Sequence, residues 1–372
     1  MKRLFALFIA VLMCALSVVS CTPAGDGGDT TDAFTDSTPT ETGDNVDVAE
    51  VETHEFIRGS AFAMWENTLY YVGEYEGDST IMQLDLSDRE GSGTTLCGAA
   101  TEDHPFRRID PDYTFLLIDE QATAKNSGHP VLIVATAHSD GVYGEIVSFD
   151  TLTEEVTVLK ENVPWVSTFT LYRDTLYYET MMYGLHKLNR DGTGYKTMAN
   201  PDNMWIQLDF VHGEKVYYHI GVGNMYACDL DLTGGKLLSD EHILEGASGD
   251  YIYGYSTVSD GFMRFDPNDL SQSEVVLEGF TMGQFYGTKF YYKDYFAEGM
   301  NSLREYDLET GEDRLLYDDG DALGDGGMKS AAAFSERYVL SYVIVWDEDD
   351  TNNEIYVTCY DLSTGEEWRL PI

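Results

Sequence analysis

In residues 176–196 the sequence reads Leu176-Tyr177-Tyr178, then Gly184-Leu185-His186-Lys187-Leu188-Asn189, then Asp191-Gly192-Thr193-Gly194-Tyr195-Lys196. The same order of features returns seven times: an aromatic or apolar run, an apolar run ending in a short polar residue, a polar turn and a further apolar run. A repeat of about 40 residues indicates one supersecondary unit copied and stacked. Because every part of the unit reads as strand, the pattern predicts an all-β fold, a β-propeller of seven four-stranded blades.

We expect the first run of each repeat to form the second strand of a blade, and the Asp-bearing run to form the third. The seven pairs of runs are 69–72 and 81–86, 131–134 and 146–150, 176–178 and 184–189, 216–218 and 225–230, 251–253 and 262–266, 290–292 and 303–308, and 338–340 and 355–362. The repeated Asp is interpreted as a turn-former, because its carboxylate can accept backbone N–H groups of the next turn. Extra residues at 119–130 and 347–353 are expected between strands, and no helix is expected.

Two segments resemble known propeller repeats. Residues 176–196 resemble the YWTD-type repeat of low-density-lipoprotein-receptor ectodomains and bacterial surface proteins, without its Trp-Thr-Asp. Residues 360–368, which end in Trp368, resemble the repeat of pyrroloquinoline-quinone-type propellers, including outer-membrane assembly lipoproteins. Residues 306–312 share the turn of residues 360–366, but Leu315 stands near the position that corresponds to Trp368. Because this leaves the ring of docking tryptophans missing, we expect no quinone. No cofactor is expected apart from the Ca²⁺ considered below.

The N-terminus predicts export and anchoring. Positive Lys2 and Arg3 precede an apolar run that ends in Val18-Val19-Ser20-Cys21, which resembles the bacterial lipobox. The resemblance implies that residues 1–20 are a lipoprotein signal peptide and that Cys21 carries diacylglycerol. Several acyl chains on one residue anchor stably, since each buried CH₂ contributes about 0.8 kcal/mol. The alternatives are an ordinary secreted protein cut nearby and an uncleaved anchor.

The lipobox and the composition together give a domain plan. Residues 21–55 are acidic, rich in Thr, Gly and Asp and free of Lys and Arg, so we expect a disordered tether. Residues 56–372 would form the propeller. The protein is then extracytoplasmic, lipid-anchored to a cell membrane or outer membrane through Cys21 only.

The formal net charge of −44 bears on partners. A field of this sign repels nucleic acid and anionic lipid, so neither is an expected partner. Basic proteins, cations and neutral glycans remain, and solubility alone is the simpler explanation. Cys97, Cys228 and Cys359 lie in apolar strand patterns, where we expect buried small hydrophobic side chains rather than disulfides.

Three sets of residues are candidate sites. Carboxylate and amide oxygens suit Ca²⁺, and two acidic stretches could supply them, although neither has EF-hand spacing and either could be a solvated loop. These weak Ca²⁺ candidates are Asp319, Asp321, Asp325, Asp347, Asp349, Asn352 and Glu354. His212 and His219, on adjacent predicted strands, could share a metal, although half-exposed strand histidines without a ligand are the simpler explanation. Trp65, Trp165 and Trp205 lie near predicted inner strands and could line one mouth of the channel, or pack in the core.

No catalytic motif is present in the sequence. The leading interpretation is therefore a non-catalytic, surface-anchored and monomeric binding or scaffolding module for a protein or glycan. Two alternatives stay open: an extracytoplasmic carbohydrate-active enzyme, either a glycosidase or a lyase, and an envelope-assembly scaffold. A glycosidase needs two carboxylates about 5–10 Å apart, which the sequence cannot nominate among 66 acidic residues.

Overall fold

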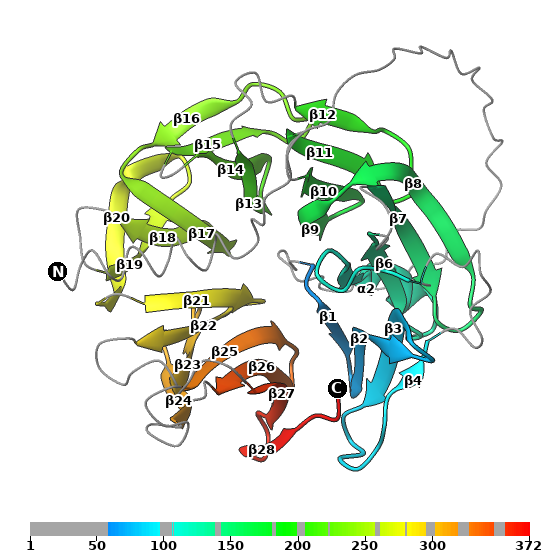
Figure 1. The fold of residues 1–372 in the computed structure, drawn as a ribbon. Coiled ribbons are helices and arrows are strands. Elements are labelled where there is room, and N and C mark those ends of the chain that lie inside the picture. The colour runs from blue at the N-terminus through cyan, green and yellow to red at the C-terminus, as the bar shows by residue number, and fades with distance from the viewer. Residues whose placement is uncertain are drawn as a thin grey trace, which may run out of the picture. The chain divides into compact units, whose positions relative to one another are not determined.

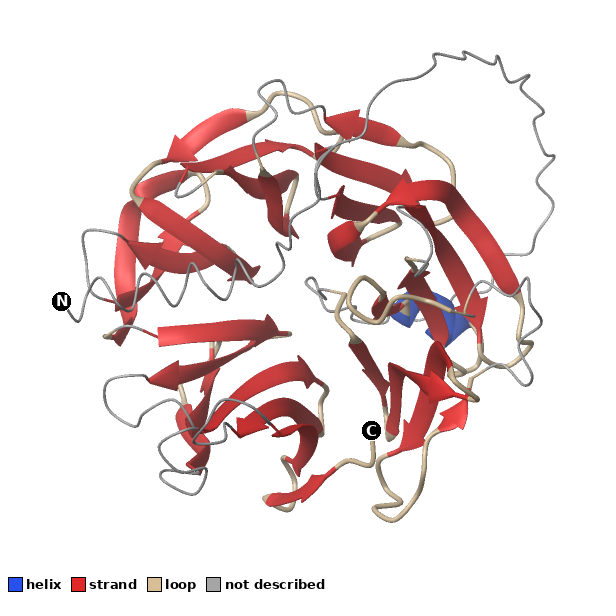
Figure 2. Ribbon diagram, viewed as in Figure 1, coloured by secondary structure: helices blue, strands red, loops and turns tan. Residues whose placement is uncertain are grey.

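The computed structural model describes residues 59–96, 106, 108–137, 143–180, 184–198, 205–221, 224–256, 261–279, 281–294, 302–318, 327–345 and 354–372. Within these residues, seven four-stranded antiparallel sheets follow one another around a common axis (Figure 1). Figure 2 shows that strands make up nearly all of the regular structure. The predicted all-β, seven-bladed propeller is confirmed.

Each blade uses four consecutive strands, numbered from the centre outward. Blades one and two contain β1 (Phe62–Trp65), β2 (Thr68–Tyr75), β3 (Asp78–Asp85), β4 (Thr94–Thr95), β5 (Phe115–Ile118), β6 (Val131–Ala135), β7 (Tyr143–Asp150) and β8 (Val156–Pro164). Blades three and four contain β9 (Val166–Tyr172), β10 (Thr175–Thr180), β11 (Gly184–Asn189), β12 (Lys196–Met198), β13 (Ile206–His212), β14 (Lys215–Ile220), β15 (Asn224–Asp229) and β16 (Lys236–Ser239). Blades five to seven contain β17 (His242–Ser248), β18 (Tyr251–Ser256), β19 (Gly261–Asp266), β20 (Asp269–Glu278), β21 (Thr281–Tyr286), β22 (Lys289–Asp294), β23 (Ser302–Asp307), β24 (Asp313–Asp318), β25 (Gly327–Phe334), β26 (Tyr338–Val345), β27 (Glu354–Asp361) and β28 (Glu366–Arg369). As predicted, the first run of every repeat lies on a second strand and the Asp-bearing run on a third.

The order of the strands defines two ends of the propeller. Because every blade is traced in the same order, all first strands begin at one end, which we call face A, and finish at the other, face B. Connections between first and second strands, and between third and fourth strands, therefore lie at face B. Connections between second and third strands, and between blades, lie at face A.

The aromatic pair of the repeat fills two interfaces at once. Tyr70 packs in the cluster between blades one and two, and its neighbour Tyr71 packs in the cluster between blades seven and one. Successive side chains of a strand point to opposite faces, so two adjacent aromatics serve both neighbouring blades. The same division holds for Tyr177 and Tyr178, Tyr217 and Tyr218, and Tyr291 and Tyr292.

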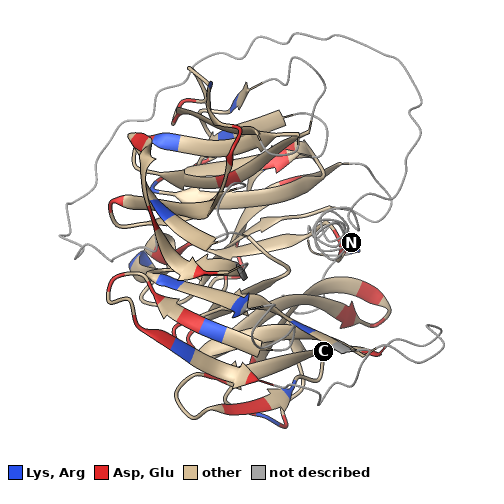
Figure 3. Ribbon diagram, turned by 90° about the vertical axis from the view of Figure 1, so that its left-hand side faces the viewer, with Lys and Arg blue, Asp and Glu red and all other residues tan. Residues whose placement is uncertain are grey.

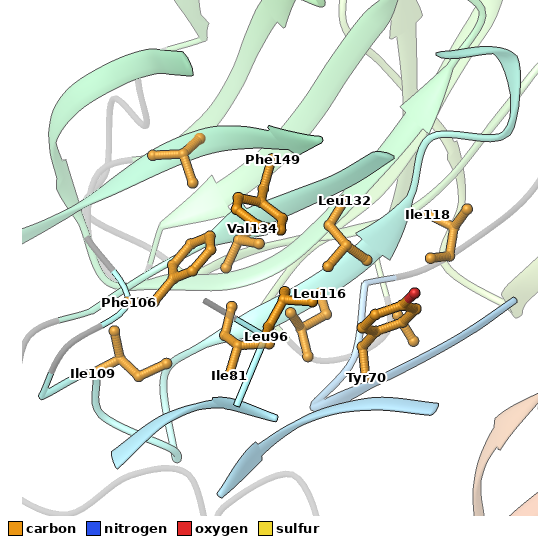
Figure 4. Close-up of a cluster of buried hydrophobic side chains, with 12 residues drawn as sticks. Tyr70, Ile81, Leu96, Phe106, Ile109, Leu116, Ile118, Leu132, Val134 and Phe149 are labelled. Atoms are coloured by element: carbon orange, nitrogen blue, oxygen red, sulfur yellow. The ribbon is translucent and has the colours of Figure 1, made fainter. Parts of the chain in front are cut away.

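Apolar clusters between adjacent blades form the core. In the cluster between blades one and two, Phe106 and Phe149 meet edge to face with ring centroids 5.3 Å apart (Figure 4). Leu132 and Val134 of β6 point into this cluster, while Ile133 and Ala135 pack against blade three. A second strand is thus buried on both sides, which explains its unbroken apolar sequence.

Side chains, rather than a shared strand, close the ring. Blade one and blade seven each come from one continuous stretch of chain. The Tyr338 hydroxyl and the Arg337 Nη1 both donate to Asn67 Oδ1, at 3.1 and 3.2 Å. Arg89 pairs with Glu366 at 2.5 Å and lies over the ring of Trp368. The joint also holds one of the apolar clusters, so its stability depends on these contacts.

The predicted turn-forming role of the repeated Asp is confirmed in five blades. The carboxylates there accept backbone N–H groups two or three residues further on, and they belong to Asp85, Asp150, Asp266, Asp307 and Asp361. In blades three and four the repeat position holds Asn189 and Asp229, and the prediction is wrong for Asp229. There the turn-forming carboxylate sits two residues later, and Asp191 and Asp231 accept from Thr193 and Thr233.

Asp229, at the repeat position of blade four, pairs with Lys215 at 2.6 Å instead. Glycines with positive φ follow in several of these turns, as expected for hairpins: Gly192, Gly234, Gly311 and Gly365.

The expectation of no helix is also wrong. The short helix α2 (Glu120–Lys125) lies between β5 and β6, inside the predicted insertion 119–130. Its N-cap, Asp119, accepts the N–H of Ala122 at 2.9 Å and pairs with Arg190 of blade three at 3.0 Å. Six residues make fewer than two turns, which is too short to show a helical period. No helix of the described residues is long and apolar enough to cross a membrane.

Before β1 the chain runs along the inner strands of two other blades. The Gly59 N–H donates to the Phe169 carbonyl of β9 at 2.8 Å, and Ser60 pairs with Leu116 of β5. A Cβ at position 59 would meet the Phe169 ring at 2.1 Å, so only glycine fits this approach. These residues therefore tie the inner strands of blades one, two and three together.

Candidate functional site

Most of the residues predicted to carry a lipid or to bind Ca²⁺ lie outside the described part of the chain. These are Cys21, Asp319, Asp321, Asp325, Asp347, Asp349 and Asn352. Of the calcium candidates only Glu354 is described, at the start of β27, where it pairs with Arg369 at 2.5 Å. The described residues contain no cluster of three or more His, Cys, Asp or Glu side chains that could hold a metal ion.

The tryptophans do not share one mouth of the channel. Trp165 and Trp205 precede first strands and lie at face A, whereas Trp65 ends β1 at face B. Trp65 packs against the core cluster between blades one and two, so the alternative of core packing holds for this residue. The Trp165 ring stacks on Tyr113, with centroids 4.6 Å apart. Trp205 is 44% exposed and carries the largest uncovered aromatic surface of the three.

His212 and His219 cannot share a metal ion. In the β13–β14 hairpin, His219 lies opposite Gln207 and His212 lies opposite Lys215. Four residues of β14, from Lys215 to His219, separate the two positions by about 13 Å along the strand. The predicted pair is therefore at opposite ends of the propeller, with His219 near face A and His212 near face B.

Bulges re-aim side chains on several inner strands. One extra residue interrupts the register of β9, β13, β17 and β25, namely Ser167, Asp209, Glu245 and Ala332. Asp209 and Glu245 occupy equivalent positions in neighbouring blades. Bulges are common beside functional sites because they redirect a side chain and end regular pairing.

Asp209 fixes the ring of His219. Both carboxylate oxygens of Asp209 lie within hydrogen-bond reach of His219 Nδ1, at 3.0 and 3.1 Å. The His219 side chain is 17% exposed. Burial by itself would lower the pKa of His219. The hydrogen bond and charge of Asp209, together with the charges of Glu179 and Glu245, outweigh this and raise it.

Nε2 of His219 has no hydrogen-bond partner among the described residues, so this nitrogen is open to a ligand.

Glu179 supports the site from blade three. This carboxylate is 1% exposed and accepts the Ser167 hydroxyl at 2.5 Å and the Leu208 N–H at 2.7 Å. Leu208 is the residue just before the bulge in β13, so Glu179 satisfies the amide at the irregular point of the strand. A buried carboxylate needs such donors, because leaving it unpaired costs several kcal/mol.

Trp205, Gln207 and His219 share one side of the blade-four sheet. The Gly221 N–H donates to the Trp205 carbonyl at 3.0 Å, which extends the β13–β14 ladder by one pair. Trp205 and Gln207 are two residues apart and therefore point the same way, and His219 faces Gln207 directly. The Trp205 and His219 rings are nearly perpendicular, with centroids 5.7 Å apart. We call these three residues, supported by Asp209, the Trp205 site.

His186, by contrast, belongs to the core of blade three. Its Nε2 lies 2.9 Å from the Thr180 hydroxyl and its Nδ1 lies 2.9 Å from the Thr197 hydroxyl. Its ring stacks on Tyr178 with centroids 4.9 Å apart. Burial, with a smaller effect of the Lys160 charge, lowers the pKa of His186 to about 4, so this ring stays neutral.

Cys228 and Cys359 lie in the described part of the chain, and both are buried with free thiols. Burial raises the pKa of Cys228 to about 12 and that of Cys359 further. The prediction of buried small hydrophobic residues is confirmed for these two.

A polar hollow of about 220 Å³ lies on blade six. Its lining is charged and consists of Lys289, Glu305, Asp307, Glu312 and Arg314. Lys289 pairs with Glu305 and Asp307 at 3.2 and 3.1 Å, and Arg314 pairs with Glu305 at 3.2 Å. Basic residues lie beside acidic ones on several strands of the propeller (Figure 3). Because its cations are paired internally, we interpret the hollow as a structural ion-pair network.

Two buried lysines lie between blades six and seven. Lys329 pairs with Glu367 at 2.7 Å and lies over the Tyr317 ring, and Lys293 donates to the Lys329 carbonyl. Burial, followed by the charge of Lys329, lowers the pKa of Lys293 to about 8. Both ammonium groups are used in holding the two blades together.

The sequence did not reveal Glu179, Gln207 and Asp209 as site residues. The available signal was weak: an acidic residue within an otherwise apolar strand, as in Ile206–Val211 and Leu176–Thr180. A buried acid in a strand usually has a partner, but the partner cannot be identified without the pairing register.

No protein-family model matches the chain, and no curated protein matches it. Among solved structures, the chain is similar to a prolyl endopeptidase at 12% identity and a TM-score of 0.54, over 86% of this chain and 51% of that one. It is similar to an acylaminoacyl peptidase of Pyrococcus horikoshii at 13% identity and a TM-score of 0.52, over 86% and 53%. A chain of a nidogen/laminin complex matches at 11% identity and a TM-score of 0.38, over 69% and 91%. This chain spans about half the length of the two peptidase chains. Likeness at such identity shows the propeller fold alone.

Proposed function

We propose that this protein is a surface-anchored lipoprotein whose propeller is a non-catalytic binding or scaffolding module, with its ligand at face A of blade four. One observation carries the proposal: an exposed indole and an open imidazole nitrogen lie on the same side of one rigid hairpin. A ligand that covers Trp205 would also reach Nε2 of His219. The lipobox ending in Cys21 and the acidic segment after it support anchoring.

The carboxylates near this site favour binding over glycoside hydrolysis. A hydrolase needs one carboxyl group as acid and another as nucleophile or base, both in reach of the sugar. Glu179 is fully buried with both oxygens bonded, and both Asp209 oxygens face His219 Nδ1. These two groups therefore support the site and are not free to react.

The proposal is tested by capturing partners of the native lipoprotein. The full chain is purified from gently solubilised envelopes, and co-purifying proteins and glycans are identified by mass spectrometry, with a Cys21→Ala variant as the mislocalised control. The proposal predicts a stoichiometric partner that is lost in the Cys21→Ala sample. Recovery of the same material with both proteins, or of none at any salt concentration, would argue against an anchored binding module.

A further inference from the structure

The Trp205 site combines an aromatic surface with groups that donate and accept hydrogen bonds. Trp205 is 44% exposed, while Gln207 and His219 beside it are partly buried. Indole presents a flat apolar face together with a polar N–H group. The side-chain amide of Gln207 offers two donors and one acceptor, and Nε2 of His219 adds one more polar contact.

Hydrogen bonds within the protein hold the backbone and the imidazole of the site in place. Trp205 and Gln207 are held by the extended ladder of β13 and β14, and the ring of His219 is oriented by Asp209. Asp209 in turn sits at a bulge whose neighbouring amide is bonded to Glu179. A site held by packing and hydrogen bonds loses little freedom when it binds, which favours affinity for a small polar ligand.

The charges around the site select against anions. Asp209, Glu179 and Glu245 all act on His219, and the chain as a whole carries a formal charge of −44. A phosphate, sulfate or uronate group would be repelled here. A neutral ligand with one apolar face and a hydroxyl edge meets no such penalty.

We propose that the Trp205 site binds a neutral saccharide, with one sugar ring stacked on the Trp205 indole and its hydroxyl groups bonded to Gln207 and to Nε2 of His219. This inference rests on the proposed binding function and names the ligand class for its site. A pyranose ring has an apolar C–H face that suits an aromatic platform. Its hydroxyl groups donate and accept, as the neighbouring amide and imidazole require.

The test uses the full chain and three neutral probes: chitohexaose, cellohexaose and maltohexaose. Binding is measured by calorimetry and by tryptophan fluorescence, with polygalacturonate as the anionic comparison and hexalysine as the cationic one. We expect at least one hexasaccharide to bind and polygalacturonate not to bind. Because a central Trp often dominates binding, Trp205→Ala should weaken the affinity at least about tenfold, and Gln207→Ala should weaken it less.

Tyr143→Ala is the matched control. Tyr143 begins β7 at face A of blade two and is 51% exposed. The substitution therefore removes a comparable aromatic surface on a different blade. Its affinity for the saccharide should equal that of the unaltered protein. Failure of all three probes to bind, equal loss in both variants, or binding of hexalysine alone would overturn the inference. In those cases a captured partner that is lost with Cys21→Ala would still support the proposed function.

Discussion

Replacing Asp361 with Asn should destabilise the propeller at neutral pH, and the loss should shrink as the pH falls toward 2. Asp361 ends β27 beside the joint between blades seven and one, and its side chain is 3% exposed. The carboxylate accepts from Arg337 Nη2 at 2.9 Å and from the Ser363 N–H and hydroxyl at 2.8 and 2.5 Å. Burial alone would raise the pKa of Asp361, but these donors outweigh it and hold the pKa at about 2.

The size of the effect follows from this pKa. A shift from the ordinary value of 3.8 to about 2 corresponds to about 2 kcal/mol, at 1.36 kcal/mol per pH unit. Because the pKa is lowered in the folded state, the stabilisation is complete above pH 4 and is lost as the pH falls toward 2. Asn keeps the turn-forming oxygen and the shape but not the charge, so Asp361→Asn should lose about 2 kcal/mol at pH 7.

Urea unfolding of the unaltered and variant proteins at pH 7, 5 and 3 measures this difference. Asp85→Asn is the control, since Asp85 makes the same turn at the surface of blade one, accepting from the Ser87 N–H and hydroxyl. Its loss should stay below about 0.5 kcal/mol, as is usual for surface positions. Equal losses in the two variants, or an Asp361→Asn loss that does not shrink between pH 5 and pH 3, would show that the Asp361 charge does not stabilise the fold.

Three further results are expected. In an NMR titration, His219 should gain its proton above pH 6.5 and His186 should gain its proton near pH 4. The stability that protonated His219 contributes is therefore present at low pH and fades as the pH rises through its folded pKa. Titration of the two histidines in the reverse order would contradict the assigned hydrogen bonds. Tyr177→Phe should lose about 1 kcal/mol in urea unfolding, because its hydroxyl donates to the Leu230 carbonyl across the blade interface at 2.9 Å; an unchanged midpoint would count against that bond. The thiol of Cys228 should not react with a thiol reagent at pH 8 until the protein unfolds, because it is buried and its pKa is raised. Rapid labelling of the folded chain would show that this thiol is accessible.

The fold could be predicted from the sequence because each blade repeats the same local sequence pattern. The pair Tyr177 and Tyr178 recurs because a second strand must fill two interfaces, and that requirement is visible in any single blade. The Asp of the third strand recurs because it closes the next turn within three residues. Even where blades three and four move this Asp by two positions, the turn itself is kept.

The candidate site was largely hidden because it depends on the pairing register. His219 appeared important only as a partner of His212, whereas the register places it opposite Gln207. Asp209 reaches His219 because a bulge interrupts β13, and bulges leave no fixed local motif. Glu179 comes from another blade, so its contact with the Leu208 amide required the stacking of blades to be known.

The binding function depends most directly on whether the captured material requires the Trp205 site. The unaltered chain, Trp205→Ala and Tyr143→Ala are expressed as lipoproteins at equal levels, and the proteins and glycans recovered with each from solubilised envelopes are quantified by mass spectrometry. We expect the ligand to be recovered with the unaltered chain and with Tyr143→Ala and to be depleted with Trp205→Ala. Equal recovery with all three proteins would contradict a binding site at face A of blade four.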